Sequence, residues 1–278
     1  MRLIVYISVI LITSSCIGEK TGRCPFWGMY RVNFHHHSND SYSVSQNITI
    51  AVSGDNPSPG LYLCKSTANP VIITSDSPVM LFPGIYQIFA LYTGEISQKS
   101  RIINLRNGYR YLYANTTAHI EKRAVNDIRL NFQLANSLIT ANFTINPEYA
   151  ISYDLISALI SPPENNNINF NIESGVCNYS TGFSSFFEEM LTDTESNHKY
   201  YYCLPVAEGG RIKFRVQLQH RESAETIILN THINNSSAIE QGMVYSFSFN
   251  ITPYSLESVG STVTDWRKFA FGRELIFK

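Results

Sequence analysis

Short segments in which apolar and polar residues alternate recur along almost the whole chain. This period of two most constrains the fold, because it is the pattern of a strand with one buried and one exposed face. Gly, Pro, Asn and Ser separate the segments. The predicted strands form two series, at residues 28–34, 46–54, 60–66, 70–75, 84–94, 100–105 and 109–117, and at residues 128–135, 138–145, 153–162, 167–174, 198–205, 211–220, 225–233 and 243–256. Many short strands with turn residues between them predict an all-β sandwich or barrel.

Composition favours the same fold class. The 278 residues include 17 Tyr and 16 Phe, and aromatic residues fit the half-buried surface of a pleated sheet. Only 15% of the residues are charged and the net charge is −1, so the chain lacks the basic footprint of a nucleic-acid-binding protein. One segment, residues 184–195, instead predicts a helix. Its apolar face would consist of Phe186, Phe187, Met190 and Leu191.

A polar stretch at residues 118–127 lies between the two series and concentrates charges that are scarce elsewhere. We therefore expect two tandem β-sandwich domains, an N-terminal one at residues 16–122 and a C-terminal one at residues 123–278. Within the first series, Asn107-Gly108 predicts a hairpin between its flanking strands, because this dipeptide favours a type I′ turn.

The first fifteen residues have the pattern of a secretory signal peptide. Arg2 supplies a positive charge, residues 3–12 form an apolar run, and small residues precede Cys16. The run is shorter than the ~20 residues that a membrane-spanning helix needs. The arrangement resembles the bacterial lipobox, in which the Cys is lipidated and becomes the first residue. We therefore predict lipidation of Cys16; an ordinary signal peptide, with Cys16 in a disulfide, is the alternative.

The number of cysteines agrees with lipidation. Without Cys16, an even set remains for an oxidising compartment, namely Cys24, Cys64, Cys177 and Cys203. Proximity along the chain favours the pairs Cys24–Cys64 and Cys177–Cys203. The other two pairings, and free thiols, are the alternatives.

Catalytic motifs are absent from the sequence. The chain has no G-x-S-x-G, H-E-x-x-H or Gly-rich phosphate-binding motif. The triplet at residues 35–37 is all His, but successive residues of a strand point to opposite faces and do not converge on a metal. We therefore expect a non-enzymatic protein with no metal and no cofactor. A hydrolase that draws its acids from distant strands is the enzymatic alternative.

Four longer segments carry a resemblance to a known family. They are LFPGIYQIFALYTG (81–94), GYRYLYANTT (108–117), NDIRLNFQLANSLITANFTI (126–145) and GMVYSFSFNITPYSLESVGSTVTDW (242–266), the last of which ends in Asp265 and Trp266. Together with the lipobox-like start, they resemble the Bacteroidales fimbrillin-like family, the subunits of type V pili.

The resemblance implies two transthyretin-like β-sandwich domains, export as an outer-membrane lipoprotein, and assembly by exchange of a donor strand between subunits. In stalk subunits of the family, an arginine-directed protease removes the first strand, and Arg23 and Arg31 are the candidate cleavage sites here. The donor is usually the C-terminal tail, here residues 266–278, whose apolar residues are Phe269, Phe271, Leu275 and Phe277. A terminal strand packed in its own domain is the alternative.

The sequence thus predicts a lipid-anchored fimbrial (pilus) subunit or anchor, exposed at the cell outer membrane, that binds other fimbrial subunits by strand exchange and contributes to adhesion. No nucleic-acid partner is expected. The alternative is a monomeric lipid-anchored surface module that binds a glycan or a protein, since aromatic residues at loop ends would suit stacking on sugars.

Overall fold

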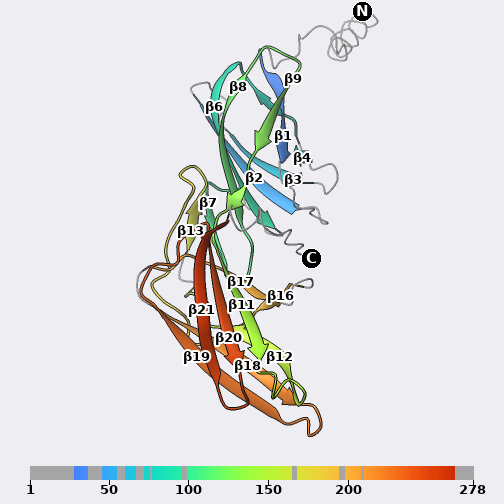
Figure 1. The fold of residues 1–278 in the computed structure, drawn as a ribbon. Helices are drawn as coiled ribbons and strands as arrows, with labels where there is room; N and C mark the ends of the chain where they lie inside the picture. The colour runs from blue at the N-terminus through green and yellow to red at the C-terminus, as the bar shows by residue number, and fades with distance from the viewer. Residues whose placement is uncertain are drawn as a thin grey trace, which may run out of the picture.

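The computed structural model describes residues 28–36, 46–54, 60–66, 72–75, 77–94, 99–164, 168–193, 198–207 and 210–266. Within these residues the named elements are all β-strands, arranged in four sheets. The predicted all-β class is therefore confirmed. The strands gather in two groups at the two ends of an elongated molecule, with a smaller sheet between them (Figure 1).

The first group is one nine-stranded sheet that folds over on itself. Its strands follow the order β10-β8-β6-β2-β3-β4-β1-β5, and β9 pairs with β1. The strands are β1 (Tyr30–His36), β2 (Gln46–Gly54), β3 (Gly60–Ser66), β4 (Ile72–Ser75), β5 (Val79–Leu81), β6 (Gly84–Gly94), β8 (Leu112–Ile120), β9 (Val125–Leu130) and β10 (Gln133–Leu134). The predicted bounds of β2, β3 and β6 are confirmed.

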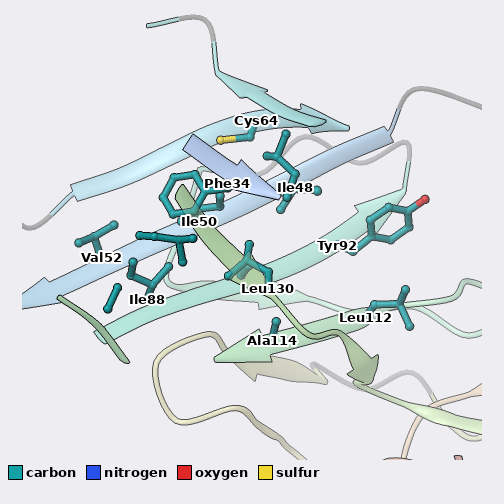
Figure 2. Packing of buried hydrophobic residues seen from close by; sticks show 14 of the residues in the cluster. Phe34, Ile48, Ile50, Val52, Cys64, Ile88, Tyr92, Leu112, Ala114 and Leu130 are labelled. Atoms are coloured by element: carbon teal, nitrogen blue, oxygen red, sulfur yellow. The ribbon is translucent and has the colours of Figure 1, made fainter. Parts of the chain in front are cut away.

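Alternation places the apolar residues of this sheet in a common core. Ile48, Ile50 and Val52 of β2 are each at most 1% exposed. Figure 2 shows them beside Phe34 of β1 and Leu130 of β9. These two strands form the layer that faces β2 across the core. The core therefore holds the folded-over sheet together as the two layers of a sandwich.

The second group consists of two sheets that share a second core. The strand orders are β16-β17-β11-β20-β21 and β15-β12-β18-β19. The strands are β11 (Ser137–Ile145), β12 (Tyr153–Ile160), β15 (Glu188–Glu189), β16 (Leu191–Thr192), β17 (Lys199–Cys203), β18 (Gly210–His220), β19 (Thr226–Asn235), β20 (Met243–Ile251) and β21 (Leu256–Asp265). Phe214 of β18 is fully buried, and its ring lies 4.8 Å from that of Phe249 and 5.5 Å from that of Phe247, both on β20.

The helix predicted at residues 184–195 is wrong. The segment forms β15 and β16 instead, as an edge strand of each sheet. Met190 between them is 2% exposed, whereas Leu191 is 48% exposed, so burial changes from one residue to the next. A helix would have placed both residues on its apolar face, but the edges of two sheets provide the hydrogen-bond partners and override the local pattern.

The two groups are joined by a small sheet and a third apolar cluster. This sheet pairs β13 (Asn169–Asn171) with β7 (Ile102–Asn104) and with β14 (Val176–Cys177). Phe170 of β13 is fully buried, with its ring 5.2 Å from that of Tyr113 on β8. A strand from the second half of the chain therefore covers the outer face of the first sheet.

The turn at Asn107-Gly108 is present, but the predicted hairpin is wrong. Gly108 has a φ of 80°, as a tight turn requires, yet β7 pairs with β13 rather than with β8. The Asn107 side chain is buried and binds the second half of the chain. Its Nδ2 donates to the carbonyl of Pro163 at 2.7 Å, and its Oδ1 accepts the N–H of Leu204 at 3.0 Å.

Asn136 and Gln241 add further hydrogen bonds at the same junction. Asn136 is fully buried; its side chain binds the backbone of Tyr109 and Tyr111, and its carbonyl accepts the N–H of Gly242 at 2.7 Å. The side chain of Gln241 accepts the N–H of Cys177 and donates to the carbonyl of Gly175. Three amide side chains, those of Asn107, Asn136 and Gln241, therefore satisfy backbone groups at this junction, and these groups come from both halves of the chain.

The boundary predicted between residues 122 and 123 remains a prediction. β9 and β10 follow it in the sequence but hydrogen-bond with β1 and β8 of the first sheet. The first sheet therefore includes strands that lie after the predicted boundary in the sequence.

Replacing Asn107 by Ala is expected to destabilise the chain by about 2–4 kcal/mol, because it leaves the buried Leu204 N–H and Pro163 carbonyl without partners. Urea unfolding followed by circular dichroism measures this loss. The matched variant Asn142→Ala removes an exposed amide from β11 and should change stability by no more than about 0.5 kcal/mol. Equal stability of the two variants would contradict the role given to Asn107.

Candidate assembly interface

The first candidate surface is the slot that β1 fills. On one side β1 runs parallel to β9, from Arg31 opposite Val125 to His36 opposite Leu130. On the other side it runs antiparallel to β5 and then to β4. The walls of the slot thus come from segments that lie about 40 and about 90 residues further along the chain.

Two buried side chains and one polar contact hold β1 in this slot. Val32 and Phe34 point into the first core and are 4% and 2% exposed. On the other face, His35 Nε2 lies 2.9 Å from Asp127 Oδ1 of β9, and Asn33 donates to the same oxygen at 3.3 Å. The hydrogen bonds from His35 and Asn33 lower the pKa of Asp127. The strand therefore combines apolar anchors with a polar contact at the surface.

The histidine triplet has a structural explanation in this contact. His35 is paired with a carboxylate, while His37 lies outside the described residues. Across the described part of the chain, no group of three or more His, Cys, Asp or Glu side chains is arranged to hold a metal ion.

The two candidate cleavage sites lie at or before the start of β1. Arg31 is exposed as the second residue of the strand, and Arg23 lies outside the described residues. A cut after either residue would leave Val32 and Phe34 attached to the rest of the chain. The next arginine in the sequence is Arg101, beyond β6. Cleavage at the predicted arginines would therefore not release the buried part of β1.

The second candidate surface is the long edge strand β21. In the described part of the chain it pairs only with β20, and residues 257–263 are all exposed. Val259 and Val263 are 65% and 57% exposed. An open edge of this length presents unpaired backbone groups to which another extended strand can add. β21 has no strand signal in the sequence, because its run of Ser, Thr and Gly lacks apolar alternation.

β21 leads directly to the C-terminal tail. Trp266, the residue after β21, is 6% exposed, packs with the first core, and donates its backbone N–H to the carbonyl of Gly242 at 3.0 Å. It also lines a cavity of about 330 Å³ together with Leu134 and Met243. The predicted donor residues Phe269, Phe271, Leu275 and Phe277 lie outside the described residues.

The three cysteines in the described part of the chain lie in three different apolar clusters. Cys64 of β3 is buried in the first core, while Cys16 and Cys24 lie outside the described residues. Cys177 packs in the junction cluster and Cys203 in the second core, and both are thiols rather than a disulfide in the structure. Their burial in different clusters favours the free-thiol alternative over the predicted Cys177–Cys203 pair, and alkylation tests which of the two holds.

Comparison with solved structures relates this fold to known proteins. The chain resembles a Bacteroides uniformis protein assigned to cell adhesion (TM-score 0.62, 13% identity, covering 86% of this chain and 99% of that one). A second protein with the same assignment, from Bacteroides ovatus, has a TM-score of 0.62 at 10% identity, covering 86% and 98%. The C-terminally truncated tip fimbrial protein Mfa3 from Porphyromonas gingivalis has a TM-score of 0.53 at 11% identity, covering 86% and 100%.

The chain has the fold of Bacteroidales adhesion and fimbrial proteins. The likeness extends over nearly the full length of each of these structures, and it agrees with the fimbrillin-like resemblance found in the sequence. No family model and no curated protein matches the sequence. No helix in the described part of the chain has the length and apolar character needed to cross a membrane.

The thiols of Cys177 and Cys203 are expected to resist alkylation in the folded protein. Burial raises the pKa of Cys177 to about 12 and also raises the pKa of Cys203. At pH 8 the thiolate fraction of Cys177 is then about one in ten thousand. Mass spectrometry after iodoacetamide treatment should find both unmodified in buffer and both modified in urea without reductant. Protection that persists in urea until a reductant is added would instead show a disulfide.

Proposed function

We propose that this chain is a subunit or anchor of a surface fimbria, that it contributes to adhesion, and that it joins other subunits by β-strand complementation. The proposal includes a lipid on Cys16 that attaches the chain to the outer membrane. The fold shared with the tip fimbrial protein supports the general role. The observation that carries the proposal is the slot around β1, which β9 lines along one side and β5 and β4 line along the other.

The slot has the properties that strand complementation requires. Its two walls offer backbone groups to an incoming strand, and its floor takes an apolar residue at every second position, as Val32 and Phe34 show. Burying each of these side chains contributes about 1.5–3 kcal/mol. A strand from another subunit with the same alternation would make equivalent contacts.

In this chain the slot is already filled, and its own sequence supports retention of β1. No arginine lies between Arg31 and Arg101, so an arginine-directed protease has no site at which to release the strand alone. A subunit with a filled slot accepts no donor strand there, but it can donate its tail, residues 266–278, to a neighbour. We therefore propose that the chain lies at one end of a fibre. A lipid on Cys16 would attach that end to the outer membrane.

A split chain tests whether the slot accepts a strand in trans. A specific protease site inserted at residues 37–45 allows the folded chain to be cut between β1 and β2. A fluorescent peptide of residues 28–36 should then exchange into the slot, as measured by anisotropy. The Phe34→Asp peptide should bind at least about 100-fold more weakly, because it would bury a charge in an apolar core.

The Arg31→Asp peptide is the matched control, since Arg31 is exposed on the same strand, and it should exchange nearly as well as the parent. Equal exchange of the Phe34→Asp peptide, or unfolding of the chain as soon as it is cut, would contradict a slot that accepts a strand in trans.

Removing residues 267–278 tests assembly in cells that produce the chain naturally. Electron microscopy should show fibres lost from the cell surface, while circular dichroism shows the truncated chain still folded. Mass spectrometry of the envelope fraction should find an acylated Cys16 as the first residue. Unchanged fibres would refute the donor role of the tail, and an unacylated Cys16 would refute the anchor.

A further inference from the structure

The outer face of the second sandwich carries a cluster of basic side chains. On β18, Ile212 and Phe214 are fully buried, so the alternate residues Arg211, Lys213 and Arg215 point away from the core. These three basic residues lie within five consecutive positions. This is a high local density for a chain in which only 15% of the residues are charged. They lie toward the end of β18 that is remote from the turn joining it to β19.

A pocket of about 220 Å³ lies at this cluster. It is lined by Phe187, Arg211, Lys213, Asn230, Thr231 and His232. Lys213 of β18 is directly opposite His232 of β19, so the two side chains are cross-strand neighbours. The pocket thus brings basic, amide, hydroxyl and aromatic groups together from two strands and from the segment before β15.

Arg215 orders one side of this pocket. Its guanidinium lies 4.0 Å from the centroid of the Phe187 ring, and its Nε donates to Asn230 Oδ1 at 2.8 Å. Because Oδ1 of Asn230 is used as an acceptor, the side-chain amide is oriented and its Nδ2 hydrogens remain to donate to a ligand. Phe187 and Asn230 are therefore held in place before any ligand binds.

The basic groups that line the pocket have no acidic partner in the part of the chain that the structure describes. Among the described residues, Arg101, Arg123 and Arg221 each pair with a carboxylate, whereas Arg211, Lys213 and His232 form no ion pair. Like charges placed side by side on a sheet repel each other. A bound anion would remove this repulsion, and the guanidinium and ammonium groups would form charge-assisted hydrogen bonds with it.

We propose that this pocket binds an acidic sugar residue of a surface glycan, through its carboxylate or sulfate group. Arg211 and Lys213 bind the acidic group, Asn230 donates to a ring hydroxyl, and Phe187 contacts the apolar C–H surface of the sugar. A bare inorganic anion would use neither the apolar edge of Phe187 nor the geometry of the Asn230 amide, whereas a sugar residue would use both. This ligand site is separate from the β1 slot and does not depend on strand exchange.

Nuclear magnetic resonance titration of the full chain tests the proposal with three matched sugars, namely 3′-sialyllactose, 3′-sulfolactose and lactose. At least one acidic sugar should shift the amide resonances of Lys213 and His232, while neutral lactose should shift them far less. The variants Arg211→Gln and Lys213→Gln should each weaken binding by roughly ten- to a hundredfold, as expected for a lost hydrogen bond to a charged group.

Three further measurements decide whether the pocket recognises a sugar. Arg129→Gln, which removes an exposed arginine on β9 and the same net charge, should leave the affinity unchanged; an equal loss would show non-specific attraction and overturn the proposal. Phe187→Ala should weaken sugar binding, with circular dichroism confirming the fold. Sulfate or phosphate ions that bind as tightly as the sugars, or failure of both acidic sugars to bind, would also overturn it.

Discussion

The buried junction between the two groups of strands is the constraint on which the rest of the structure depends. Asn107 and Asn136 are buried polar side chains that satisfy backbone groups from both halves of the chain. Around them, Phe170 and its neighbours cover the outer face of the first sheet with apolar residues from the second half. Buried amides of this kind tolerate few alternative arrangements, because any shift leaves a polar group unsatisfied. The junction therefore fixes where the edges and ends of both sandwiches lie.

Edges are the property of these sandwiches that matters most for the proposed assembly. A β-sandwich that is not closed into a barrel always has strands with one unpaired side, and proteins either protect such edges or use them. The first sheet contains a slot filled by β1, whereas β21 at the edge of the second group pairs on one side only among the described residues. Both features suit a protein that binds others through backbone hydrogen bonds. The basic pocket on β18 lies on the face of a sheet instead, so the proposed sugar binding and the proposed strand assembly use different surfaces.

Sequence patterns predicted the strands well wherever burial followed a period of two. The bounds of β2, β3 and β6 matched because Gly or Ser stands at or next to the ends of each strand. β21 was missed because its side chains are exposed on both faces and leave no alternation to detect. The segment containing Met190 was misread as a helix because two short edge strands lie too close together to show a strand period.

The sequence alone determined that the chain forms strands, that these strands bury aromatic and aliphatic residues, and that the resulting fold is all-β. Only the tertiary structure decided that β1 lies between β9 and the pair β4 and β5, that Asn107 binds the second half of the chain, and that Lys213 faces His232. The physical reason is the range of the interactions. Burial on one face is set by a residue and its near neighbours along the strand, whereas pairing depends on segments tens of residues apart that meet only after the chain has folded.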